Sequence, residues 1–193
     1  MAQACAVHGY GPTTIADIVE PAGVSRATFY ELFKNKEECL HATMELSLAD
    51  AMDCFGDAYS PDKPWPDSVR DCTAAFLDLL ARRPDFARMA LIEAPAAEGR
   101  SFEIYASGKR VLQILVDRGR DCATGGPIPD SAGRAALAGA ESLIAGQILA
   151  GNSERLSELL PDIVYILTVP YLGQDEALRQ SRRAEDSIRA GAD

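Results

Sequence analysis

A short run of side chains near the N-terminus has the chemistry to contact DNA: Arg26, Ala27 and Thr28. An Arg can make two parallel hydrogen bonds to guanine in the major groove, and the methyl groups of Ala and Thr can contact the methyl group of thymine. The simpler alternatives are a solvated Arg and two ordinary outward-facing residues of a helix. The elements around this run therefore decide between the two interpretations.

Residues 14–22 are predicted to form a helix that precedes the run. Thr14 is its expected N-cap, with Asp17 three residues later as the partner of a capping box. The spacing of its apolar residues gives the helix one buried face. These residues are Ile15, Ile18, Val19 and Ala22.

A tight turn and a second helix follow, and together they carry the run. Gly23 lies where the turn needs a left-handed backbone, which Gly adopts at little cost. Ser25 caps the second helix, predicted over residues 25–32, and Val24, Phe29 and Phe33 are its expected buried residues. This is the helix-turn-helix plan, in which the second helix enters the major groove.

The stretch from Gly23 to Phe33, followed by Asn35-Lys36-Glu37-Glu38, resembles the tetracycline-repressor (TetR-like) family. The specific resemblance covers residues 5–40, and residues 169–173 resemble the end of the last body helix in many members. The family joins a three-helix DNA-binding head to a larger helical body that binds a ligand and forms dimers.

The resemblance implies an all-α protein in three parts. Residues 1–40 would form the helix-turn-helix DNA-binding head with a shortened first helix, and residues 41–173 the helical-bundle body for ligand binding and dimerisation. Residues 174–193 are polar and of mixed charge, so we expect a solvated or frayed tail.

Further DNA contacts are expected from the resemblance. Tyr30 matches the family tyrosine that reaches a phosphate, although it can also pack against Phe33. Lys36 matches the family lysine at the start of the fourth helix, where the helix N-terminus also favours a phosphate. Thr14 can add a hydrogen bond to phosphate beyond its role as a cap. The expected DNA-binding set is Thr14, Ser25, Arg26, Ala27, Thr28, Tyr30 and Lys36.

Charge argues against this set. The chain has a net charge of −10, and residues 1–45 hold three Lys and Arg against six Asp and Glu, whereas a DNA-reading domain usually has a basic surface. The first helix, over residues 2–8, is short, so either the natural start lies upstream or the head has lost part of this helix. The alternative function is a ligand- or protein-binding module with weak or lost DNA binding.

The body is expected to be a bundle of helices around an effector pocket. Asn35 and Glu38 begin a long helix that runs to about Tyr59 and connects head and body. Further helices are predicted over residues 67–82, 85–93, 98–119, 131–151 and from 160 onward. The resemblance places a small, mainly apolar effector among Met and aromatic side chains, which can equally be plain core: Met52, Phe55, Phe76, Met89, Phe102 and Tyr105.

The two helices over residues 131–151 and from 160 onward are apolar almost all round, so we expect them to be buried on more than one side. A four-helix interface between two copies would achieve this, and the family uses its last two helices in that way. The homodimer residues expected here are Leu137, Ile144, Ile148, Ile163 and Leu167.

Nothing in the sequence predicts catalysis, a cofactor or a metal. His8 and His41 are isolated, and the five Cys are widely spaced, which favours reduced thiols in a cytoplasm. No nucleotide-binding or nucleophile motif is present. No window of 18 uninterrupted apolar residues exists, so no membrane-spanning helix is expected. A helical enzyme stays as the third hypothesis, without a residue set to support it.

Overall fold

The computed structural model describes residues 1–95, 99–123 and 126–191, and all the regular structure in these ranges is helical. The predicted start of the helix over 98–119, part of the loop after it and the last two residues lie outside the described residues. The elements are α1 (Ala2–His8), α2 (Ile15–Ala22), α3 (Arg26–Leu32), α4 (Lys36–Ala58), α5 (Trp65–Arg82), α6 (Pro84–Arg88), the π-helical turn η1 (Met89–Glu93), α7 (Arg100–Asp117), the 3-10 turn η2 (Arg118–Cys122), α8 (Ala132–Leu149), the 3-10 segment η3 (Ser153–Leu159) and α9 (Leu160–Gly191).

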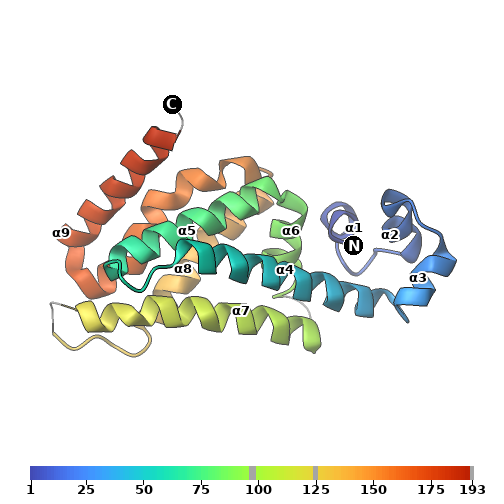
Figure 1. Cartoon of the computed structure of the whole chain (residues 1–193), viewed down its shortest axis with the longest axis horizontal. Helices are drawn as coiled ribbons and strands as arrows, with labels where there is room; N and C mark the ends of the chain where they lie inside the picture. The colour runs from blue at the N-terminus through green and yellow to red at the C-terminus, as the bar shows by residue number, and fades with distance from the viewer. Residues whose placement is uncertain (96–98, 124–125, 192–193) are drawn as a thin grey trace.

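Helices α1 to α3 form a small head at one end of the molecule, and α4 runs from this head along the body (Figure 1). The head has a core of its own, to which each of its helices and the start of α4 contribute. Its buried residues are Ala4, Ile18, Val19, Phe29 and Cys39.

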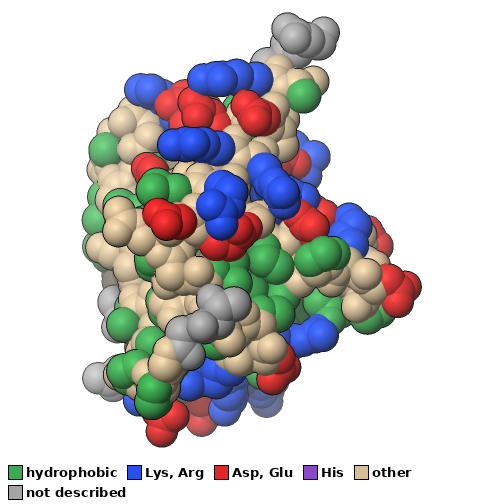
Figure 2. Space-filling view, turned by 90° about the vertical axis from the view of Figure 1, so that its left-hand side faces the viewer, with side chains coloured by type: hydrophobic (Ala, Val, Ile, Leu, Met, Phe, Trp, Pro, Cys, Tyr) green, Lys and Arg blue, Asp and Glu red, His purple; other side chains and the backbone are tan. Residues whose placement is uncertain are grey.

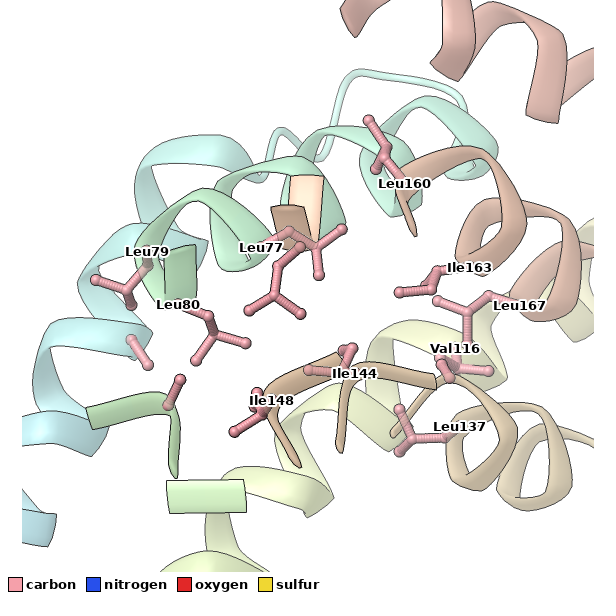
Figure 3. Close-up of a cluster of buried hydrophobic side chains, with 14 of the residues drawn as sticks. Leu77, Leu79, Leu80, Val116, Leu137, Ile144, Ile148, Leu160, Ile163 and Leu167 are labelled. Atoms are coloured by element: carbon pink, nitrogen blue, oxygen red, sulfur yellow. The ribbon is translucent and has the colours of Figure 1, made fainter. Parts of the chain in front are cut away.

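The body is built on α5, α8 and α9, whose apolar side chains meet in one cluster (Figure 3). Leu77 and Leu80 of α5 are completely buried, and Ile148 of α8 and Ile163 of α9 lie in the same cluster. Burying one such side chain stabilises the fold by about 1.5–3 kcal/mol, so this cluster is the main source of stability.

Two glycines allow the ends of several body helices to approach closely. A Cβ on Gly119 would lie 2.5 Å from the Trp65 ring, and one on Gly133 would lie 2.5 Å from the Tyr171 hydroxyl. The Tyr171 hydroxyl donates to an Asp117 carboxylate oxygen at 3.1 Å. This contact joins α9 to the end of α7.

The C-terminal segment corrects the prediction of a solvated tail. Helix α9 bends at Gly173 (φ 74°, ψ 170°) and then continues to Gly191. Ala177 and Ala184 on its inner side are completely buried, so this segment packs on the body. Figure 2 shows charged side chains of both signs over its outer side and apolar side chains gathered below it.

By length and composition alone, the stretch Ser153–Ala190 is apolar enough to cross a membrane, which differs from the expectation of no such helix. Its most apolar residues, Ile163, Val164 and Leu167, are buried in the body cluster. Packing within the chain therefore accounts for its composition.

Candidate nucleic-acid interface and ligand pocket

Helix α2 begins with the predicted capping box. The Thr14 hydroxyl oxygen accepts from the backbone N–H of Asp17 at 3.4 Å, and the Asp17 carboxylate accepts from the backbone N–H of Thr14 at 2.8 Å. The Thr14 hydroxyl also donates to that carboxylate at 2.7 Å, and these hydrogen bonds lower the pKa of Asp17. Because the hydroxyl has one proton to donate, Thr14 is engaged as a cap and has no free donor for a phosphate.

The turn and α3 also follow the predicted local structure, with one exception. Gly23 has φ 66° and ψ 25°, the left-handed conformation, and the Ser25 hydroxyl accepts from the backbone N–H of Thr28 at 3.0 Å. Phe29 is buried, and Phe33 is half-buried. Val24, however, is 44% exposed, so its predicted burial is wrong. It lines an open groove together with Met1 and Phe29.

Helix α3 directs the candidate reading residues outward. Arg26 and Ala27 are exposed, Thr28 is half-buried and Tyr30 is 57% exposed. The Tyr30 ring contacts the buried Phe29 edge-on, with 5.5 Å between centroids, so its hydroxyl end is free to project. Arg26, Ala27 and Tyr30 thus lie exposed on one short helix, whereas Thr28 also lines the groove beside Val24.

In this structure the Lys36 ammonium is not free for the predicted contact with a phosphate. Its ammonium donates to the carbonyl oxygens of Tyr10 at 3.0 Å, Gly11 at 2.7 Å and Thr13 at 3.0 Å. An ammonium has three donors, and all three are used within the chain. Lys36 therefore ties the loop between α1 and α2 to the start of α4.

The start of α4 differs slightly from the predicted capping box. The Asn35 side chain accepts from the backbone N–H of Glu38 at 2.9 Å, as expected of a cap. The Glu38 carboxylate, however, accepts from the backbone N–H of Lys34 at 2.6 Å rather than from that of Asn35. Lys34 itself stays exposed on the head.

A cavity of about 90 Å³ lies in the body between α4, α5, η1 and α7, and its walls are almost entirely apolar. Five of the six predicted pocket residues line it: Met52, Phe55, Phe76, Met89 and Tyr105. Phe102 does not, because it is 48% exposed near the start of α7, where Ile104, Tyr105 and Gly108 turn toward the cavity instead.

Three residues that meet from two helices form the polar part of the pocket wall. The Lys109 ammonium of α7 forms an ion pair with the Glu141 carboxylate of α8, and the Tyr105 hydroxyl donates to Glu141 at 3.4 Å. Burial and the nearby Glu141 charge raise the pKa of Tyr105. Burial opposes the charged form of Lys109, but Glu141 outweighs it and the pKa of Lys109 rises. The sequence holds no signal for Lys109 and Glu141, because their helices are distant in the chain.

The π-helical turn η1 connects this pocket with the head. Met89 and Leu91 of η1 line the cavity, and Glu93 at its end accepts a hydrogen bond from the backbone N–H of Tyr10 at 3.1 Å. The Arg88 guanidinium lies 3.8 Å from the same Glu93 carboxylate. Pocket and head thus share a five-residue element of a type often found at functional sites.

The predicted dimer residues lie inside the single chain. All five are at most 6% exposed, in the cluster of Figure 3, so they cannot also face a second copy: Leu137, Ile144, Ile148, Ile163 and Leu167. The reason is that α9 packs on α5, and α8 packs on α9, η3 and α7. The outer face of α8 instead exposes small and apolar residues, among them Ala135, Ala138, Leu143, Gly146 and Leu149.

Residues 2–43 match the family model described as "Bacterial regulatory proteins, tetR family". The head of the molecule is therefore similar to the DNA-binding head of tetR-family regulators. A relative from Bacillus subtilis (strain 168), the uncharacterized HTH-type transcriptional regulator YxbF, is 33% identical over 75 residues. That match covers 39% of this chain and 20% of YxbF, so the chain spans only a small part of its length.

Two solved structures share the fold of this TetR-like chain. The fatty acid degradation regulator FadR from Bacillus halodurans has a TM-score of 0.72 at 18% identity, over 86% of this chain and 93% of that one. A tetR-family regulatory protein from Rhodococcus RHA1 has a TM-score of 0.64 at 18% identity, over 86% and 92%. The predicted all-α architecture of head and body is confirmed.

Proposed function

We propose that this chain is a TetR-like repressor that binds a palindromic operator as a dimer and releases it when a small, mainly apolar molecule enters the body pocket. The observation that supports this most directly is η1, which lines the pocket at Met89 and holds the head at Glu93. A role on DNA also implies a cytoplasmic location.

The switch follows from this shared element. Operator binding requires one arrangement of the two heads in the dimer, and that arrangement depends on the contact between Glu93 and Tyr10 and on the course of α4. A ligand shifts the equilibrium only if it binds the released arrangement more tightly than the DNA-bound one. The small volume of the cavity, about 90 Å³, favours this view, because a ligand larger than a few water molecules must displace its walls.

Dimerisation is proposed through the outer face of α8, together with the half-buried residues of α9 beside it. Ala138 and Gly146 are small enough to allow two helices to approach closely, and Leu143 and Leu149 are exposed apolar side chains that a partner would cover. A second copy related by two-fold symmetry would present the same face, which suits a palindromic site.

Operator binding is the decisive test. The purified chain, and a version extended upstream, are titrated against DNA from the upstream region of its gene and against a scrambled duplex, at moderate salt. We expect specific binding, and Arg26→Ala should reduce discrimination between the two duplexes by roughly 1–3 kcal/mol. Arg110→Ala, on the exposed side of α7, is the matched control. Absence of specific binding by both versions would overturn the proposal.

The acidic head supports a second candidate, a ligand- or protein-binding module without tight DNA binding. Residues 1–45 hold three Lys and Arg, and one of these, Lys36, is occupied by backbone carbonyls. If neither version of the chain binds DNA but the body binds a ligand, this candidate replaces the repressor.

A further inference from the structure

A second apolar groove continues the pocket along α4 and α7. Phe55 and Leu112 line both the pocket and the groove, so the two spaces meet at these side chains. The Phe55 ring stacks on Phe76 at 5.4 Å between centroids, which places an aromatic wall at the junction. The groove is lined by Phe55, Tyr59, Cys72, Val111, Leu112, Ile114, Leu115 and Arg118.

Together the pocket and the groove form one long track. Its wall on α4 extends from Met44 to Tyr59, and its wall on α7 and η2 extends from Ile104 to Arg118. The two helices lie side by side and run in the same direction (Figure 1). At 1.5 Å per residue, each wall is roughly 20 Å long. The shape therefore suits an elongated molecule rather than a compact one.

The walls of the groove are apolar even where they are open to solvent. Val111 is 44% exposed and Ile114 is 66% exposed, on the same stretch of α7. At the base of the groove, burial raises the pKa of Cys72 to about 11. A bound apolar chain would remove this surface from water, which is favourable by about 25 cal/mol per Å².

The charges along the track are unevenly compensated. Among the described residues, three charged ones line it, and two of these, Lys109 and Glu141, form an ion pair at the pocket wall. The third, Arg118, is exposed at the far end of the groove and makes no ion pair within the part of the chain that the structure describes. Its guanidinium lies 5.5 Å from the centroid of the Tyr59 ring, which holds it beside the groove.

We propose that the pocket and the groove are a single site for an elongated amphiphile with an anionic head. The apolar chain passes Phe55 and Leu112 into the pocket, and the head binds Arg118 at the open end. A guanidinium can donate two parallel hydrogen bonds to a carboxylate, which makes it a selective partner for this group. The inference rests on the proposed function in one respect only, that the body cavity binds a small, mainly apolar molecule.

The opposite orientation is less favourable. An anionic head placed inside the pocket would meet the Glu141 carboxylate and would have to break its ion pair with Lys109. A cationic head at the mouth would be repelled by Arg118. The arrangement of charge therefore favours a ligand with an anionic head group, and it favours binding of that group at the Arg118 end of the track.

Calorimetric titration of the full chain tests the proposal. The probes are straight-chain carboxylates from octanoate to hexadecanoate, with the primary alcohol and the primary amine of each length, all below micelle-forming concentrations. We expect affinity to rise with chain length, and carboxylates to bind roughly tenfold or more tightly than the alcohols, because the hydrogen bond at Arg118 is charge-assisted.

Two variants separate this site from unspecific binding. Arg118→Gln should remove the preference for carboxylates and leave the affinity for alcohols unchanged, whereas Arg110→Gln, which is exposed on α7 outside the track, should change neither. Ile114→Asp is at an exposed position, so the fold should tolerate it, and its charge should weaken carboxylates more than alcohols.

Affinity independent of chain length, or equal effects of Arg118→Gln and Arg110→Gln, would overturn the proposal. The result is distinguishable from failure of the proposed repressor. Carboxylates that bind as expected but do not release the operator support the site and contradict its effector role. Specific operator binding without carboxylate binding contradicts the site and leaves the DNA-binding function intact.

Discussion

The Glu93 carboxylate accepts a hydrogen bond from the backbone N–H of Tyr10 at 3.1 Å, across 83 positions of the chain. Tyr10 lies in the loop between α1 and α2, and its carbonyl oxygen accepts from Lys36 at the start of α4. Glu93 ends the π-helical turn whose first residue, Met89, lines the pocket. Glu93 therefore connects the pocket wall with the head at Tyr10, and Lys36 connects Tyr10 with the connecting helix.

We expect Glu93→Ala to weaken the coupling between ligand and operator. The ratio of operator affinities without and with a saturating ligand should fall severalfold, because coupling energies of this kind are typically about 1–3 kcal/mol. Fluorescence anisotropy with labelled operator gives the ratio. Glu103→Ala, at an exposed position of α7, is the control. An unchanged ratio in Glu93→Ala would show that coupling runs through α4 alone.

Lys36 and Lys34 should behave differently although they are two residues apart. Lys36→Met should destabilise the protein by about 1–3 kcal/mol, because three carbonyls lose a charged donor. Lys34→Met should leave stability unchanged and, if Lys34 contacts a phosphate, reduce the salt dependence of DNA binding by about one unit of slope. Urea unfolding and DNA titrations over a range of salt concentrations measure both effects. If Lys36→Met instead kept its full stability and reduced the salt dependence of DNA binding, Lys36 would be a phosphate contact and not a structural residue.

Tyr171 should make the protein less stable at alkaline pH. Burial, followed by the hydrogen bond to Asp117, raises the pKa of Tyr171 from 10.0 to about 12. The folded state therefore keeps the proton while the unfolded state loses it, so stability is intact below pH 10 and falls as the pH rises toward 12. Urea unfolding across this range should show the loss, and Tyr171→Phe should reduce it. If the wild-type protein and Tyr171→Phe lost equal stability at alkaline pH, the loss would come from other titrating groups.

A charge on the outer face of α8 should separate the proposed dimer. Gly146→Arg places a cation where no neighbouring atom lies within 4 Å of the added Cβ, so the single chain should still fold. Sedimentation should then give a monomer with weaker operator binding. Gly56→Arg, at an equally open glycine of α4, is the matched control and should stay dimeric. A dimer in both variants would place the interface elsewhere.

The head shows how far local sequence determines structure. Thr14, Gly23 and Ser25 act where they were predicted to act, because a cap or a left-handed turn depends on residues within three or four positions. The boundaries of α4 and α8 follow for a similar reason. Asn35 caps α4 and Pro61 follows it, whereas Pro129 precedes α8 and Gly151 follows it. The apolar and aromatic residues that line the cavity were mostly named from the family resemblance, because helical periodicity marks an inward face but does not separate a pocket wall from plain core.

Errors arose where a side chain has more than one available partner. Leu137 and Ile163 belong to helices that are apolar on several sides, and periodicity alone does not say which side faces the core of the same chain and which faces a second copy. The family resemblance suggested that Lys36 contacts a phosphate, but in this structure its ammonium donates to three carbonyl oxygens of the loop after α1. Phe102 has the right residue type and spacing but lies beyond the end of the cavity.

The sequence by itself determined the helix-turn-helix, its caps and the all-α class, because these depend on local backbone preferences and on periodic burial. Tertiary structure alone decided the contact between Glu93 and Tyr10, the ion pair between Lys109 and Glu141, and the position of Arg118 at the end of an apolar track. Each of these depends on helices that are distant in the chain, and their relative placement is set by packing of the whole core.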